Sequence, residues 1–163
     1  MRRTSAAWMA FFALTVAASA AESPASAPKT PRPKAETVTV SGTALTLAEA
    51  LKAVELKVDT EPAAKQVVIQ GEDGRVTPLL SDEASRALFV DGRLRGRRTE
   101  VRGLSRAGLP YLQVVSFRIE DGGRLRTPEY YCEVCTISVR FPQICPCCQG
   151  EMVLRMKPER VDP

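Results

Sequence analysis

Residues 132–148 read CEVCTISVRFPQICPCC, and this stretch contains all five cysteines of the chain. Four of them form two Cys-x-x-Cys pairs, Cys132 with Cys135 and Cys145 with Cys148, and nine residues separate the pairs. Each pair forms a tight turn that points two sulfurs the same way, and two facing turns supply four thiolates in the tetrahedral arrangement that suits Zn²⁺. The spacing therefore predicts a site for one metal ion, with zinc as the expected metal.

The second pair resembles the knuckles of zinc ribbons and rubredoxin-like proteins, which often read C-P-x-C-x-G. The matching residues are Cys145, Pro146, Cys148 and Gly150. Proline presets φ, and glycine permits a close approach of backbone amides to sulfur. Residues 136–141 alternate as a strand and residues 151–156 would return, so the resemblance implies a zinc ribbon. Such a small module has too little core to fold alone, and zinc can supply about 10–16 kcal/mol of apparent binding free energy.

Three other uses of these cysteines fit the same spacing. Iron could occupy the site as in rubredoxin, because S₄ geometry does not separate the two metals. Disulfides are usual in exported proteins, although full pairing of five cysteines would leave one thiol free. Cys147 lies beside Cys148, and adjacent thiols do not easily serve one tetrahedron. Cys147 is therefore either a spectator or part of a site for thiol exchange or Cu⁺, with Met152 or Met156 as soft ligands.

The N-terminus has the layout of a secretory signal peptide over residues 1–20. Arg2 and Arg3 form a basic start, residues 6–18 are apolar and uncharged, and Ala-Ser-Ala follows at 18–20. The apolar run is shorter than the roughly 20 residues that span a bilayer, so we expect cleavage and no membrane span afterwards. The arginine pair leaves twin-arginine export open beside the general route. We predict an exported protein, either periplasmic or secreted.

Residues 21–36 hold four prolines among small and charged residues, a composition that favours an extended linker. From residue 37 the pattern changes to short alternating strands, expected at residues 37–40, 66–70, 75–80, 98–103 and 111–120. Short helices are expected at 47–56 and 81–90, capped by Thr46 with Glu49 and by Ser81. Five strands with a helix between the third and fourth is the order of an OB-fold, a small partly open barrel.

Residues 67–120 also look like small exported bacterial OB-like domains, with loosely matching motifs. The matches are Glu72-Asp73-Gly74, Leu79-Leu80, Arg98-x-Glu100-Val101-x-Gly103 and Val114-x-x-Phe117-x-Ile119. This resemblance supports the OB-like fold and implies almost nothing about activity. The predicted architecture is mainly β with one or two short helices. A small OB-like β-barrel at residues 37–120 is followed by a zinc ribbon at 121–158 and a tail at 159–163.

The chain contains no histidine, which excludes Ser-His-Asp and Cys-His catalytic arrangements and the attachment of c-type haem. Any metal must then be held by thiolate or carboxylate groups. A catalytic zinc would need an open coordination position, whereas this spacing offers four thiolates. No acid pair or nucleophile site is recognisable either, so we expect no enzymatic activity.

The formal net charge is +4, a mild excess that is compatible with an anionic partner. A candidate anion-binding cluster consists of Arg93, Arg95, Arg97, Arg98 and Arg102, with Arg106 close behind. Arginine binds phosphate well. However, no aromatic residues lie between these arginines, and a surface that binds nucleic acid would need them for base stacking. Together with export, this argues against nucleic acid. The alternative is a solvated basic face paired with Asp91, Glu100 and Glu120.

These observations predict an exported, non-enzymatic binding or assembly module with a structural Cys₄ zinc site. Its partner is not identified by the sequence, and another exported protein or an anionic ligand would fit. The alternative function is a periplasmic protein that handles copper or thiol redox chemistry through the C-terminal cysteines.

Overall fold

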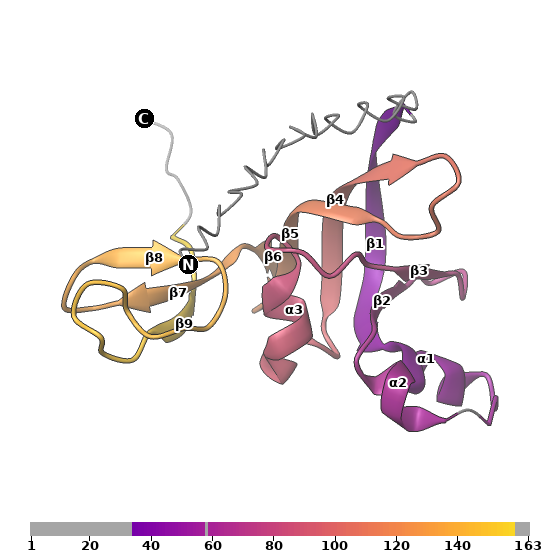
Figure 1. Ribbon diagram of the computed structural model, residues 1–163, viewed down its shortest axis with the longest axis horizontal. Coiled ribbons are helices and arrows are strands. Elements are labelled where there is room, and N and C mark those ends of the chain that lie inside the picture. Colours follow the sequence, from indigo (N-terminus) through magenta and orange to yellow (C-terminus); the bar gives the residue numbers. More distant parts are fainter. Residues whose placement is uncertain (1–33, 58, 159–163) are drawn as a thin grey trace, which may run out of the picture. The chain divides into compact units, whose positions relative to one another are not determined.

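The computed structural model describes residues 34–57 and 59–158. The predicted signal peptide, most of the predicted linker and the tail at 159–163 lie outside these residues. Within the described ranges the fold is mainly β, with antiparallel sheets and three short helices (Figure 1). Strands β1 to β6 form one sheet, in the order β3-β2-β1-β4-β5-β6, and β7 to β9 form a second, in the order β8-β7-β9.

The six-stranded sheet is built around the long strand β1 (Ala35–Thr46). Its first part pairs with β4 (Arg98–Arg106), and its last residues pair with β2 (Val67–Gln70). Gly42 lies where β1 meets β2, and a Cβ atom there would stand 2.2 Å from the carbonyl oxygen of Gln70. The strand predicted at residues 37–40 therefore continues to Thr46, and glycine is needed for a close backbone approach.

The remaining strands of this sheet are β3 (Val76–Pro78), β5 (Gln113–Asp121) and β6 (Arg124–Arg126). The sheet is not a closed barrel. Among the described residues, β3 meets the start of β5 through an isolated parallel bridge between Leu79 and Leu112. Pro78 ends β3 after three residues and has no N–H to donate, which limits the pairing at this edge.

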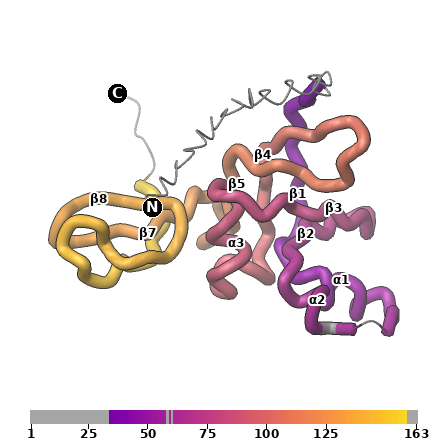
Figure 2. The backbone as a smooth tube through the Cα atoms, in the orientation of Figure 1, coloured from indigo at the N-terminus to yellow at the C-terminus, as the bar shows by residue number. Residues whose placement is uncertain are grey.

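The first helix confirms its predicted start. Helix α1 (Leu47–Ala53) follows β1 directly, and the N–H of Glu49 donates to Thr46 Oγ1 at 3.2 Å. The N–H of Thr46 donates in turn to the Glu49 carboxylate at 2.7 Å, which completes the capping box. A second helix, α2 (Thr60–Ala64), was not expected from the sequence. Figure 2 shows both helices beyond the end of β1, beside β2.

The helix between β3 and β4 is shorter than predicted. Helix α3 (Arg86–Val90) begins after Ser85, not after Ser81, and a 3₁₀ turn, η1 (Gly92–Leu94), follows it. Ser85 is fully buried, and its hydroxyl donates to the carbonyl of Leu80 at 2.6 Å. Its oxygen also accepts the N–H of Asp82 at 3.0 Å. These bonds hold residues 81–85 in a turn, because short polar side chains compete with helix formation.

The three-stranded sheet consists of β7 (Pro128–Cys132), β8 (Ile137–Val139) and β9 (Val153–Met156). The predicted strands at 136–141 and 151–156 are thus present with shorter bounds. The third and central strand, β7, was not expected from the sequence. Tyr130 of β7 is 1% exposed and belongs to the same hydrophobic core cluster as Leu88 of α3 and Ile119 of β5. The two sheets therefore share one core.

Candidate metal centre

The first cysteine turn begins at the end of β7, which places Cys132 at the point where the strand stops. The N–H of Thr136 donates to the Cys132 carbonyl at 2.8 Å and closes the turn. Thr136, directly after Cys135, has a φ of 55°. This left-handed conformation reverses the chain, so that it returns along β7 as β8.

The second turn repeats this backbone. The N–H of Gln149 donates to the Cys145 carbonyl at 2.9 Å, and Gln149 has a φ of 59°. In both turns the left-handed residue therefore comes directly after the second cysteine. Gly150 leaves room for the Cys148 sulfur, because a Cβ atom at position 150 would lie 3.4 Å from that sulfur. The N–H of Cys145 donates to the Gly150 carbonyl at 2.9 Å and closes the base of the turn.

The two turns bring the four predicted ligands together. The Sγ atoms of Cys132, Cys135, Cys145 and Cys148 all lie within 4.8 Å of one another. Those of Cys132 and Cys148 are 3.5 Å apart, and all five cysteines are unbridged. Zn–S bonds of about 2.3 Å in a tetrahedron separate the sulfurs by about 3.8 Å. The donor set therefore fits a tetrahedral metal ion.

Backbone amides point at the first sulfur of each turn, and at Cys145 they outweigh burial and favour the charged form. Cys132 Sγ accepts the N–H of Cys135 at 3.5 Å. The backbone N–H of Cys148, assisted by that of Cys147, lowers the pKa of Cys145 to about 6. Thiolate is the form of cysteine that binds metals. Cys132 and Cys145 are buried, whereas Cys148 is exposed, so the cluster has an inner and an outer side.

The fifth cysteine lies on the outer side. Cys147 is exposed and stands apart from the group of four sulfurs. The neighbouring thiols of Cys147 and Cys148 raise the pKa of Cys135. The role of Cys147, as a spectator or in thiol or metal exchange, stays a prediction.

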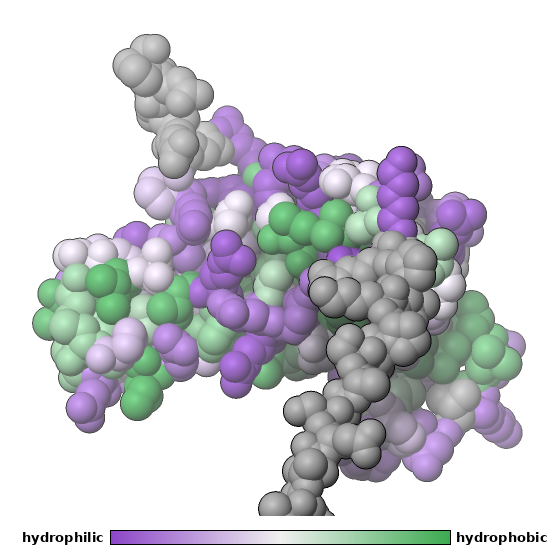
Figure 3. All heavy atoms as spheres, turned by 45° about the horizontal axis from the view of Figure 1, so that its top comes forward, coloured by the Kyte–Doolittle hydropathy of each residue, from purple (hydrophilic) through white to green (hydrophobic). Residues whose placement is uncertain are grey.

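The turns also expose apolar side chains beside the cysteines. Val134 is 82% exposed and Ile144 is 67% exposed. The left-hand part of Figure 3, where the three-stranded sheet lies, shows hydrophobic residues at the surface.

Three arginines of the predicted cluster have partners within the described chain. Arg93 pairs with Asp91 at 2.6 Å, as the alternative expected, and Arg97 pairs with Asp121 at 2.9 Å. Arg95 donates to the last carbonyls of α3, at 2.8 Å and 3.1 Å. Arg98 and Arg102 are exposed on β4, and among the described residues neither has an acidic partner. An anion-binding role for the cluster stays a prediction.

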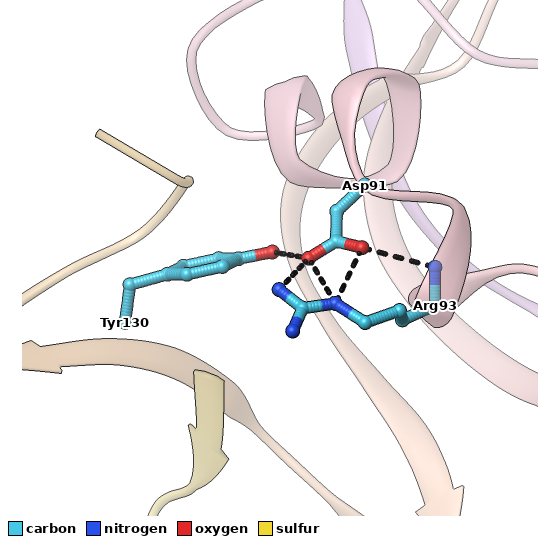
Figure 4. A network of polar contacts seen from close by, with 3 residues as sticks. All are labelled: Asp91, Arg93 and Tyr130. Atoms are coloured by element: carbon cyan, nitrogen blue, oxygen red, sulfur yellow. Dashed lines mark hydrogen bonds and ion pairs between the residues drawn. The ribbon is translucent and has the colours of Figure 1, made fainter. Parts of the chain in front are cut away.

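A polar network that the sequence did not reveal joins the three-stranded sheet to the turn after α3. The Tyr130 hydroxyl donates to Asp91 Oδ2 at 2.6 Å, and the Arg93 guanidinium donates to both oxygens of the same carboxylate (Figure 4). The pKa of Asp91 falls to about 2, first because of the Arg93 hydrogen bonds and also because of Tyr130. Tyr130 lies two residues before the ligand Cys132, so the network anchors the strand that carries the metal site.

The comparisons with known proteins identify no relative. No protein-family model matches the chain, and no curated protein or solved structure matches it. In the part of the chain that the structure describes, none of the helices has the length and apolarity to cross a membrane.

Proposed function

We propose that this protein is an exported, non-enzymatic binding or assembly module with a structural zinc site at Cys132, Cys135, Cys145 and Cys148. The observation that carries the proposal is the matched backbone of the two cysteine turns, which gathers four sulfurs within 4.8 Å. A chance cluster of thiols would not need two turns of the same design. Export rests on the sequence of residues 1–20, which lie outside the described residues.

A structural role for the metal follows from the ligand set. Four thiolates complete the tetrahedral coordination of Zn²⁺ and leave no position for water or substrate. The full sequence has no histidine that could act as a base near the site. The three-stranded sheet is small, and two of the sulfurs are buried in it, so metal binding would contribute directly to its folding.

Two fold assignments belong to the same proposal. For residues 121–158 we propose a zinc ribbon, supported by the sequence of turn, strand, turn, strand around the cysteines. For residues 37–120 we propose an OB-like, partly open barrel. Three features support it: the strand order β3-β2-β1-β4-β5, helix α3 between β3 and β4, and the parallel bridge from Leu79 to Leu112.

Elemental analysis and thiol counting on the mature protein, purified from its native compartment, test the proposal. We expect one zinc ion per chain and one readily titrated thiol, Cys147, because it is exposed and outside the ligand set. Cys147→Ser should keep the zinc, and Cys145→Ser should lose it. Metal-free protein with two disulfides, or stoichiometric iron with its visible absorption, would rule out the zinc site. N-terminal sequencing of the same sample checks export, which requires removal of the leader.

One observation favours a second candidate function, the handling of a soft metal or of thiols. Cys147 is exposed, and its thiol is close enough to raise the pKa of Cys135, so it could replace that ligand during exchange. Met152 and Met156 pack against the hydrophobic core, which gives them a structural use instead. If exchange is the function, Cys147→Ser should slow metal transfer to a competing chelator severalfold. An unchanged rate leaves the structural role as the better account.

A further inference from the structure

Two cavities meet on the outer face of the six-stranded sheet. The first, of about 300 Å³, opens between β5 and the three-stranded sheet and is lined by Ser116, Ser138 and Arg140, among others. The second, of about 240 Å³, lies over β1, β4 and β5 and is lined by Thr39, Arg102 and Ser116. Because both share Ser116, Phe117 and Thr127, they form one continuous groove. We call it the junction groove.

The groove crosses the strands at a fixed row of residues. Thr39 of β1 is the register partner of Arg102 of β4, and Arg102 is the partner of Ser116 of β5. Neighbouring strands lie about 4.8 Å apart, so this row is about 10 Å long. The first cavity extends it past Ser116 to Ser138 and Arg140. At about 3.3 Å per residue, about three residues of an extended peptide span the row, and further residues would lie in the first cavity.

The charges along the groove are unbalanced. Its two carboxylates are already paired: Glu100 with Arg118 at 2.5 Å, and Glu129 with Arg155 at 2.8 Å and Lys157 at 3.8 Å. Within residues 34–57 and 59–158, Arg102 and Arg140 have no acidic partner. Both are exposed and line the groove. The unmatched charge is therefore positive at two separated points.

The polar lining is uncommitted as well. The hydroxyls of Thr39, Ser116, Thr127 and Ser138 make no hydrogen bond to another described residue, so each can donate to a ligand. The large aromatic side chain of the groove, Phe117, is only 8% exposed. Nucleic acids need exposed aromatic faces on which bases stack, whereas carboxylates need arginines and hydroxyl donors.

We infer that the junction groove binds an extended acidic peptide segment of a partner protein. Arg102 and Arg140 each take one carboxylate, and the hydroxyls between them bind the remaining polar groups. This inference rests on the proposed function as a binding module, because it names the class of partner. It does not depend on which metal the cysteines hold.

Fluorescence anisotropy of a labelled, end-capped peptide of six glutamates tests the inference on zinc-loaded protein at low ionic strength, where surface charges are least screened. The joint variant Arg102→Gln with Arg140→Gln should weaken binding about tenfold, as expected for two exposed charge contacts. The joint variant Lys52→Gln with Lys57→Gln is the matched control: it also removes two exposed positive charges, and both residues lie outside both cavities. Its affinity should stay within twofold of the wild type.

Three results would overturn the inference. Equal binding of a six-glutamine peptide would show that charge is not recognised. An equal loss in the joint variant Lys52→Gln with Lys57→Gln would show general attraction to a basic surface. Tighter binding of single-stranded oligothymidine would identify the wrong class of ligand. Zinc content is measured on every variant, so a failed groove with intact zinc is distinct from failure of the metal proposal.

Discussion

At the residue scale, the side chains that matter most for the metal site include two that bind no metal. Asp91 is 7% exposed and receives hydrogen bonds from Arg93 and Tyr130. Tyr130 spans from the strand that ends in Cys132 to the turn after α3. A buried carboxylate of this kind is stable because its oxygens have donors, and removal of one donor is costly.

Tyr130→Phe tests the value of that donor. The change removes the hydroxyl and keeps the ring in the core, so the hydrogen bond to Asp91 is lost. We expect the free energy of unfolding of the zinc-loaded protein to fall by about 1–2 kcal/mol, measured by urea denaturation. The matched control is Tyr131→Phe, because the Tyr131 hydroxyl has no hydrogen-bond partner among the described residues. Equal losses in the two variants would contradict the role of the network.

Asp91 also predicts a pH dependence of stability. Its folded-state pKa is about 2, whereas an unfolded aspartate titrates near pH 4. Because the folded-state pKa is lower, Asp91 contributes its full stability above about pH 4 and loses it as the pH falls toward 2, about 2 kcal/mol in total. Urea unfolding across this range should therefore show a steeper loss for the wild type than for Asp91→Asn. Metal loss at low pH affects both proteins, so parallel curves would refute the prediction.

At the scale of single elements, the two cysteine turns each place a residue other than glycine in a left-handed conformation. Gln149 has a φ of 59°, and a left-handed residue with a side chain costs about 1–2 kcal/mol. Glycine avoids this steric cost, but part of the gain is offset because glycine loses more conformational entropy on folding. The turn is therefore held in place by its hydrogen bonds and by the sulfurs that it gathers.

Gln149→Gly should stabilise the second turn. We expect the midpoint of thermal unfolding of the zinc-loaded protein to rise by a few degrees, which corresponds to about 0.5–1 kcal/mol. Gln143→Gly is the control, because Gln143 is equally exposed and does not have a positive φ. The same change there should leave the midpoint unchanged or lower it. A lower midpoint for Gln149→Gly would mean that the left-handed turn is not strained.

The sequence predicted features that depend on neighbouring residues better than it predicted contacts between distant residues. The cysteine turns and the capping box of Thr46 and Glu49 depend on residues three or four apart, so spacing alone revealed them. Strand β7 was missed because four of its five residues are buried and nothing alternates. The bond from Tyr130 to Asp91 joins residues 39 apart, and no local signal specifies it. Whether the six-stranded sheet closes into a barrel could not be predicted either, because closure depends on how far β3 extends before Pro78.

At the scale of the whole described chain, the two sheets are energetically connected. Tyr130 of the three-stranded sheet lies in the core of the six-stranded sheet, and Phe141 and Leu154 pack against the same core. Arg86 of α3 stacks over the Phe141 ring at 4.5 Å. Loss of the metal should therefore destabilise parts of the chain beyond the cysteines.

Removal of zinc by a chelator tests this connection by amide hydrogen exchange. We expect protection to fall first in residues 128–156, since the metal holds the two turns together. It should then fall around residues 85–94, because Tyr130 and Phe141 no longer hold that region. Residues 98–106 of β4 are the internal reference and should keep most of their protection. Loss confined to the cysteine turns would show that the sheets are independent.

Strand β7 holds Tyr130 in the core and Cys132 in the metal site, and this sets which lengths of chain can change. One residue inserted between them would turn one of the two side chains to the opposite face of the strand. Residues 142–144, between Phe141 and the second turn, are exposed, have no strand partners and can be lengthened or shortened. A distant relative would thus keep the spacing Tyr-x-Cys-x-x-Cys, while the interval to its second cysteine pair would vary.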